Sequence, residues 1–267
     1  MLRVIALRRF YTQGLSDVWI YKTPEQAPST SGFCYHRSMR ELRKVVLFGA
    51  SGMVGQGVLR ECWLDPQISE VVSIVRSSTG EHDAKVREVA IQNFYNFSGI
   101  ENELSGVNAC FFCLGISSAG MTEERYRHIT YDITLAAART LAKLNPDMTF
   151  IYVSGMGTDS TERGRSMWAR VKGQTENDLL RLPIQAYAFR PGMIVPMHGA
   201  RSKTRVYRWL YAALTPLLPL LNSLFPKHVT TTEQIGRAMI HVATQGAPKK
   251  ILETADINAI SQLSETA

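Results

Sequence analysis

The sequence predicts an α/β protein, a single doubly wound domain built around a parallel sheet. Short apolar runs alternate with segments of helical period from Lys44 onward, as in consecutive parallel crossover units. A glycine-rich turn separates the first apolar run from the first helical segment. Hydrophobic residues make up 45% and charged residues 20% of the 267 residues, which is ordinary globular composition and excludes a disordered or collagen-like chain.

Six apolar runs are predicted to be strands. The fourth is apolar along most of its length, as are strands that helices cover on both faces. The predicted strands are residues 44–49, 70–76, 86–91, 107–115, 148–155 and 186–192.

Three helices are predicted between these strands. The first runs from about Met53 to Leu64, and another covers residues 166–182. Between them, Thr122 is expected to cap a helix that ends at Asn145-Pro146. The apolar residues of this helix keep helical spacing, at Tyr126, Ile129, Ile133, Ala137, Leu141 and Leu144.

Residues 1–43 are predicted to be a flexible N-terminal extension, followed by the domain at 44–267. They hold seven Lys or Arg against three Asp or Glu, so +4 of the formal net charge of +7 lies there and +3 in the domain. This distribution does not indicate a nucleic-acid partner. Arg3, Arg8 and Arg9, with no acid before Asp17, are typical of an organelle transit peptide. The same composition fits equally an upstream extension, residues 1–38, that precedes a domain beginning at Met39.

Four cysteines without a secretory leader indicate a reducing compartment, and we expect the cytoplasm, or an organelle if residues 1–38 are a transit peptide. Cys110 and Cys113 have the spacing of a redox motif. Strand positions three apart point to opposite faces, however, so we expect two buried thiols rather than a reactive pair. The six histidines show no ligand spacing, and no metal site is predicted.

The glycine-rich turn indicates a dinucleotide site. In such a turn the first glycine permits a tight bend, the second lets backbone amides approach a pyrophosphate, and the third lets the helix pack close to the sheet. The following helix presents free N–H groups and its positive dipole end to the phosphates. The candidate residues are Gly49, Ala50, Ser51, Gly52, Met53, Val54 and Gly55.

The end of the second predicted strand favours NADP over NAD. An acid about 20 residues beyond the glycines holds the ribose 2′-OH of NAD, whereas an Arg there accommodates the 2′-phosphate of NADP. Arg76 lies 21 residues beyond Gly55, and no acid follows it before Glu81. A solvated arginine at a strand end is the alternative interpretation.

Several segments together resemble the short-chain dehydrogenase/reductase superfamily, in its atypical branch. They occur in order from about residue 44 to 260, and the nearest likeness is the Tat-interacting oxidoreductase-like group. The resemblance implies a Rossmann domain that binds NADP(H), with a variable C-terminal part over a substrate site. The segments are GASGMVG (49–55), FCLG (112–115), YVSG (152–155), WARVKG (168–173), FRPG (189–192) and ILE (251–253).

The resemblance also implies roles for individual residues. Ser154 takes the catalytic, substrate-facing serine position, and the catalytic Lys172 holds the nicotinamide ribose. Leu114 and Gly115 line the adenosine side, and Asn93 lies near the adenine. Asp132 takes a helix position where many relatives have Asn. The loop beside the nicotinamide consists of Arg190, Pro191 and Gly192.

One residue departs from the family pattern. The superfamily's reactive pair is Tyr-x-x-x-Lys, one helical turn apart, in which the lysine lowers the pKa of the tyrosine that transfers the proton. Lys172 is preceded at this spacing by Trp168, whose indole does not titrate near neutral pH. Ser154, Tyr152 and a bound water are the remaining candidates for the proton donor.

Residues 183–232 form a variable apolar and basic segment, expected on the substrate side. Its apolar part, 209–225, is interrupted by Pro216, Pro219 and Asn222 and is too short to predict a spanning helix. We expect a helical flap over an apolar substrate pocket. Peripheral membrane contact through residues 201–225 is the alternative.

These observations favour an NADP(H)-dependent oxidoreductase acting on an apolar, small-molecule carbonyl or alcohol. Trp168 supports a different class, a regulatory or interaction protein that binds a dinucleotide without turnover. Isomerase or epimerase chemistry suits the same fold.

Overall fold

The structure is a computed structural model that describes residues 42–78, 84–200 and 227–263. The predictions for the N-terminal extension, and for flap or membrane contact through residues 201–225, lie outside the described residues.

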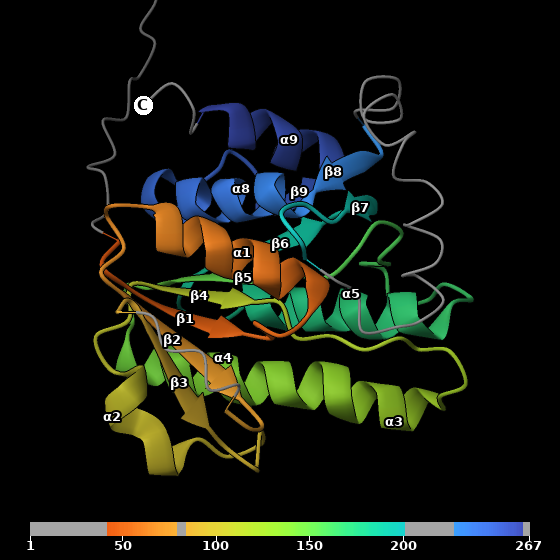
Figure 1. Ribbon diagram of the computed structural model, residues 1–267. Helices are drawn as coiled ribbons and strands as arrows, with labels where there is room; N and C mark the ends of the chain where they lie inside the picture. Colours follow the sequence, from red (N-terminus) through yellow and green to blue (C-terminus); the bar gives the residue numbers. More distant parts are fainter. Residues whose placement is uncertain (1–41, 79–83, 201–226, 264–267) are drawn as a thin grey trace, which may run out of the picture. The chain divides into compact units, whose positions relative to one another are not determined.

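Within these ranges, a parallel sheet of seven strands forms the centre of the domain (Figure 1). Its order is β3-β2-β1-β4-β5-β6-β9, and every neighbouring pair is parallel. The first strand, β1, thus lies inside the sheet, and the later strands are added outward on both sides of it, which confirms the predicted doubly wound Rossmann fold. The strands are β1 (Lys44–Phe48), β2 (Glu70–Val75), β3 (Val86–Ala90), β4 (Ala109–Phe112), β5 (Thr149–Val153), β6 (Gln185–Arg190) and β9 (Ile251–Glu253).

Helices cover both faces of this sheet, because alternate residues of each strand point to opposite layers. Val45 and Leu47 of β1 belong to one core, and Val46 and Phe48 to the other. The first layer contains α1 (Met53–Leu64), α8 (Thr232–Gln245) and α9 (Thr254–Leu263). The second contains α2 (Glu101–Leu104), α3 (Glu123–Arg127), α4 (Ile133–Leu144) and α5 (Met167–Leu180), with a 3-10 helix at Ser98–Ile100.

The predicted helix after Thr122 is divided into three parts. Thr122 caps α3, with its Oγ accepting a hydrogen bond of 3.3 Å from the Arg125 N–H. A π-helical turn, His128–Asp132, then precedes α4, which ends before Asn145 as predicted. Hydrophobic spacing did not indicate the π-turn, because Ile129 within it and Ile133 and Ala137 beyond it still pack in the same second core.

The domain begins earlier than the predicted boundary at residue 44. Leu42 is buried in the first core. Arg43 is fixed to two neighbouring segments, since its carbonyl accepts the Ser69 N–H at 2.8 Å and its own N–H donates to Asn108 Oδ1 at 3.0 Å. Both residues are therefore part of the domain.

The C-terminal part contains elements that the sequence analysis missed. Strands β7 (Met193–Val195) and β8 (Val229–Thr231) pair in parallel as a second small sheet. Helix α8 opens with a capping box, in which Thr231 Oγ accepts the Gln234 N–H and the Gln234 side chain accepts the Thr231 N–H, both at 3.0 Å. The spacing Thr-x-x-Gln was the available sequence signal.

Helices α1 and α8 approach closely because both carry glycine at their contact. A Cβ built on Gly57 would lie 2.5 Å from Thr232 Cβ and 2.8 Å from the Thr232 carbonyl oxygen. A Cβ on Gly236 would lie 2.6 Å from Glu61 Cγ. This contact holds the start of α8 against the helix that follows the glycine turn.

We expect Gly57→Ala to lower the free energy of unfolding by about 1–3 kcal/mol, because the added methyl overpacks a backbone contact. Urea denaturation would measure the loss. Gly99→Ala is the matched control, because a Cβ there meets nothing within 4 Å, and its effect should stay within about 0.5 kcal/mol. A Gly57→Ala protein as stable as wild type would contradict the packing described.

Candidate active site

The candidate site lies where the direction of winding reverses. Strands β1 and β4 are neighbours, but the chain leaves them toward opposite helical layers. The loops at their carboxyl ends therefore diverge and leave a crevice, the usual ligand position in open α/β sheets.

A cavity of about 480 Å³ opens at this point. Its lining comes from the turn before α1, from the segments that follow β4, β5 and β6, and from α5 and β7. The lining residues are Gly52, Met53, Val54, Cys113, Leu114, Gly115, Ile116, Val153, Ser154, Gly155, Met156, Trp168, Lys172, Pro191, Gly192 and Ile194.

The glycine turn forms a cradle that side chains would fill. Gly49 has a φ of +82°, and a Cβ there would lie 2.7 Å from the Leu114 nitrogen. A Cβ on Gly55 would lie 2.1 Å from the Gly49 carbonyl oxygen. Gly52 precedes α1 without a side-chain cap, and the first turn of α1 carries no acid. The helix N-terminus is thus open to an anion, and the turn fits a dinucleotide pyrophosphate.

Helix α5 places two of its residues in the cavity. Trp168 and Lys172 are four residues apart, so their side chains share a face. The Lys172 ammonium donates a hydrogen bond to the Ser154 carbonyl oxygen. Burial lowers the pKa of Lys172 to about 8, although the nearby carboxylate of Glu176 opposes this shift.

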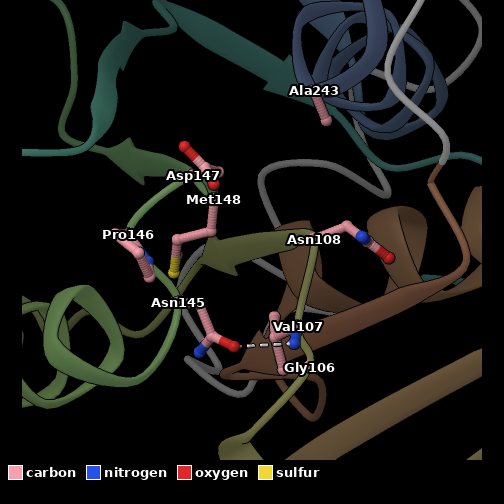
Figure 2. A pocket seen from close by; sticks show the side chains of 8 residues that line it. All are labelled: Gly106, Val107, Asn108, Asn145, Pro146, Asp147, Met148 and Ala243. Atoms are coloured by element: carbon pink, nitrogen blue, oxygen red, sulfur yellow. Dashed lines mark hydrogen bonds between the residues drawn. The ribbon is translucent and has the colours of Figure 1, made fainter.

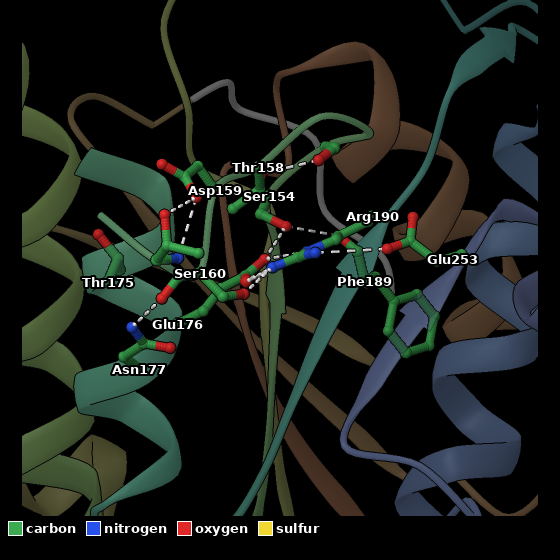
Figure 3. Close-up of polar contacts among 12 residues, drawn as sticks. Ser154, Thr158, Asp159, Ser160, Thr175, Glu176, Asn177, Phe189, Arg190 and Glu253 are labelled. Atoms are coloured by element: carbon green, nitrogen blue, oxygen red, sulfur yellow. Dashed lines mark hydrogen bonds and ion pairs between the residues drawn. The ribbon is translucent and has the colours of Figure 1, made fainter. Parts of the chain in front are cut away.

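The Ser154 hydroxyl lies in a buried polar network beside the cavity (Figure 3). Its Oγ is 2.5 Å from Glu176 Oε1 and 3.1 Å from the Phe189 carbonyl oxygen. Glu176 is fully buried and forms an ion pair with Arg190, whose Nε is 3.0 Å from Glu176 Oε1. Arg190 also contacts Glu253 at 3.4 Å. The carboxylate of Glu176 thus neutralises a guanidinium whose side chain is only 12% exposed, and it accepts a hydrogen bond from the serine hydroxyl.

Because of this network, the polar groups of two predicted site residues, Ser154 and Arg190, point in directions other than those predicted. The resemblance to the short-chain dehydrogenases/reductases implies that Ser154 faces the substrate, but its hydroxyl is directed to Glu176, and its carbonyl oxygen accepts a hydrogen bond from Lys172. Arg190 was predicted beside the nicotinamide, but its guanidinium is held by Glu176, and only Pro191 and Gly192 of this loop line the cavity. The cause is Glu176, a buried charge one helical turn beyond Lys172. The segment VKGQTE contains it, but no role was predicted for it.

Three further predicted residues do not line the cavity. Arg76 follows β2, is exposed, and has no ion-pair partner among the described residues. Asn93 follows β3, and its Oδ1 accepts the Tyr95 N–H at 2.9 Å in a local turn. Asp132 lies in the π-helical turn, where its carboxylate contacts His128 Nδ1 at 2.8 Å.

Leu114, Gly115 and Cys113 line the cavity. Cys110 packs in the second core and Cys113 against the first, so the two thiols point to opposite faces of the sheet. Burial raises the pKa of the Cys113 thiol far above its usual range. Cys62, Cys110 and Cys113 are free thiols.

A second cavity, of about 510 Å³, lies at the opposite edge of the sheet (Figure 2). It is formed by the segments before β4 and β5, together with Ala243 of α8. The Asn145 Oδ1 in its wall accepts the Val107 N–H at 3.0 Å and so joins these two segments. The glycine turn and Lys172 are absent from its lining. The first cavity is therefore the candidate active site.

No family model matches the chain. Protein T of the leucinostatins biosynthesis cluster of Purpureocillium lilacinum is 26% identical over 141 residues, which is 51% of this chain; the match spans about half the length of that relative, 51%. "Protein FMP52, mitochondrial" of Saccharomyces cerevisiae is 30% identical over 166 residues, 60% of this chain and 68% of that protein.

Solved structures share the fold. The Bordetella bronchiseptica enzyme WbmF, in complex with NAD+, matches with a TM-score of 0.58 and 13% identity, over 84% of this chain and 79% of that chain. A short chain dehydrogenase/reductase from Saccharomyces cerevisiae matches with a TM-score of 0.56 and 14% identity, over 82% of this chain and 98% of that chain. The chain therefore has the fold of the short-chain dehydrogenases/reductases, and it belongs to the same family as the yeast protein FMP52.

The described ranges contain neither a helix suited to span a membrane nor a cluster of metal ligands. None of the helices there has the length and apolar character needed to cross a bilayer. These ranges also hold no group of three or more His, Cys, Asp or Glu side chains arranged to bind a metal ion.

We expect Glu176→Gln to lower the free energy of unfolding by about 3 kcal/mol, because it leaves the largely buried guanidinium of Arg190 beside a neutral amide. Urea denaturation would measure the change. Glu253→Gln removes the exposed partner of the same guanidinium and should cost at most about 1 kcal/mol. Equal losses of unfolding free energy in the two variants would show that Glu176 stabilises Arg190 no more than Glu253 does.

Proposed function

We propose that this chain is an atypical short-chain dehydrogenase/reductase that binds NADP(H) in the candidate active site and reduces a small apolar carbonyl compound, or oxidises the corresponding alcohol. The observation that carries the proposal is that the glycine cradle at the start of α1 and Lys172 of α5 belong to one cavity. The WbmF complex with NAD+ and the short chain dehydrogenase/reductase of yeast support the class of cofactor and reaction.

When bound, the nicotinamide supplies or accepts the hydride. The amides between Gly49 and Gly55 would hold the pyrophosphate at the start of α1. Leu114 and Gly115 would cover the adenosine side, and Pro191 and Gly192 would lie beside the nicotinamide. Lys172 would hold the nicotinamide ribose. Ser154 would act through its carbonyl, which orients the Lys172 ammonium.

Arg76 supports a preference for NADP. Its exposed guanidinium follows β2, next to the strand that leads into the glycine turn. None of the described residues neutralises it, so it is available for the 2′-phosphate. Asn93, one strand further along the sheet, would lie near the adenine.

Apolar side chains around the cavity support an apolar substrate. Ile116 is 39% exposed and Met156 is 48% exposed, although both are large hydrophobic residues. Trp168 and Ile194 line the same cavity. Exposed hydrophobic residues that gather at one opening are typical of a site that binds apolar ligands.

A second function, dinucleotide binding without turnover, is favoured by Trp168. It occupies the position of the family's proton-donating tyrosine and lies in the cavity. The Ser154 hydroxyl is also engaged by Glu176. This alternative predicts that the wild type binds NADPH but does not reduce a carbonyl compound, and that Trp168→Tyr gains this reduction. Observing both results would favour a binding protein without turnover.

For localisation we propose the cytoplasm, with an organelle as the alternative. The word "mitochondrial" in the name of the yeast relative supports the alternative. Imaging a C-terminal fluorescent fusion would separate the two.

We expect the purified wild-type chain to bind NADPH in calorimetry and to release NADP on denaturation, as detected by mass spectrometry. Gly55→Ala should weaken NADPH binding at least 10-fold, because the methyl would displace the Gly49 carbonyl and distort the cradle. Gly99→Ala should bind like wild type, and circular dichroism would verify that each variant is folded. Absence of NADPH and NADH binding at millimolar concentration by folded wild type would refute the proposal.

We expect Arg76→Glu to reduce the preference for NADPH over NADH by about 10- to 100-fold, because a charged hydrogen bond to the 2′-phosphate is replaced by repulsion. The ratio of the two dissociation constants is the measurement. Arg125→Glu makes the same charge change at an exposed position of α3 and should leave the ratio unchanged. An unaltered ratio in Arg76→Glu would remove Arg76 from the site.

A further inference from the structure

We infer that Lys172 itself donates the proton that completes carbonyl reduction, in place of the tyrosine that Trp168 replaces. This inference rests on the proposed function and assigns the acid of that same site.

The first support is the set of side chains that line the cavity. Those with a polar hydrogen are Cys113, Ser154, Trp168 and Lys172. The indole N–H does not titrate near neutral pH, and burial keeps Cys113 protonated as a thiol. The Ser154 hydroxyl is committed to Glu176. Lys172 is the lining side chain that is left with a proton to transfer.

The second support is the position of the ammonium. Its contact with the Ser154 carbonyl uses one of three N–H donors, so two are left for the cavity. The contact also fixes the end of a flexible side chain between α5 and the segment after β5. A positioned acid is more effective than a mobile one.

The third support is the electrostatic environment of Lys172. The charged group that acts on Lys172 is Glu176 on α5, Cys113 after β4 lines the same cavity, and Tyr152 on β5 and Arg190 on β6 interact with Glu176. Glu176 and Arg190 neutralise each other, and burial raises the pKa values of Tyr152 and Cys113. Burial lowers the pKa of Lys172 to about 8, close to the operating pH of a useful general acid.

The reaction step balances with the proposed cofactor. The carbonyl carbon receives the hydride, and the electron pair released from the C=O bond takes a proton from Lys172 Nζ. The product is an alcohol, and Lys172 is left as a neutral amine that regains a proton from water. In reduction the ammonium is required, so the rate is constant below about pH 8 and falls above it. In oxidation the neutral amine is required, so the rate rises through the same pH.

The first test is direct titration of Lys172 in the full chain, with and without NADPH. Lysine labelled with ¹³C at Cε is followed by NMR, and the signal lost in Lys172→Arg assigns the residue. We expect a midpoint near pH 8. A midpoint above pH 10 would overturn the inference and leave the proposed function intact, whereas loss of NADPH binding in wild type would overturn the proposed function itself.

The second test compares Lys172→Arg in two backgrounds, with NADPH and 4-nitrobenzaldehyde as the probe. Arginine keeps the positive charge but does not release a proton. In the wild-type background we expect NADPH binding within about 3-fold of normal and a reduction rate about 100-fold lower. In the Trp168→Tyr background the loss should be below about 10-fold, because the phenol supplies the proton.

Equal losses in the two backgrounds would assign Lys172 to cofactor binding alone and overturn the inference. A wild-type chain that binds NADPH but does not reduce the aldehyde would also overturn it, and would favour the binding protein. Circular dichroism and NADPH affinity would identify any variant that fails to fold, and in that case the titration of wild-type Lys172 decides.

Discussion

The candidate site exists because backbone segments approach one another at Gly49 and Gly55 more closely than any side chain would allow. Gly49 lies against the start of the loop after β4, and Gly55 lies against Gly49 itself. This double approach brings the amino end of α1 to the carboxyl edge of the sheet, with its N–H groups open. The cavity walls from β4, β5 and α5 are arranged around that point, so the rest of the site depends on it.

Helix α5 joins the chemistry of the site to the stability of the domain. Trp168, Lys172 and Glu176 follow one another at intervals of four residues and share a face. The first two line the cavity, and the third is buried against Arg190. The carboxylate that stabilises the guanidinium also engages the Ser154 hydroxyl, and so leaves the serine carbonyl, not its hydroxyl, to contact Lys172. The ion pair between Glu176 and Arg190 thus determines which polar groups of Ser154 and Lys172 remain available in the cavity.

The sequence predicted the bounds of strands and helices best where the predicting pattern involves only neighbouring residues. The strand and helix around the glycine turn follow the predicted bounds, because apolar runs and helical periods depend only on neighbouring residues. The π-helical turn at His128–Asp132 and the small sheet of β7 and β8 were not predicted. Each depends on contacts with distant segments, and β8 is only three residues long. The capping box at Thr231, by contrast, is a local pattern, Thr-x-x-Gln, that the sequence carries in adjacent residues.

The sequence by itself determined the fold class, the glycine turn and the four-residue spacing of Trp168 and Lys172, because each depends on adjacent residues or on one helical turn. Only the tertiary structure decided the directions of Ser154 and Arg190. Their partner, Glu176, lies on another element, and a buried charge takes the nearest opposite charge and hydrogen-bond donor that folding brings to it. The state of Lys172 was decided in the same way, since burial against the sheet, and not its place in the sequence, lowers its pKa.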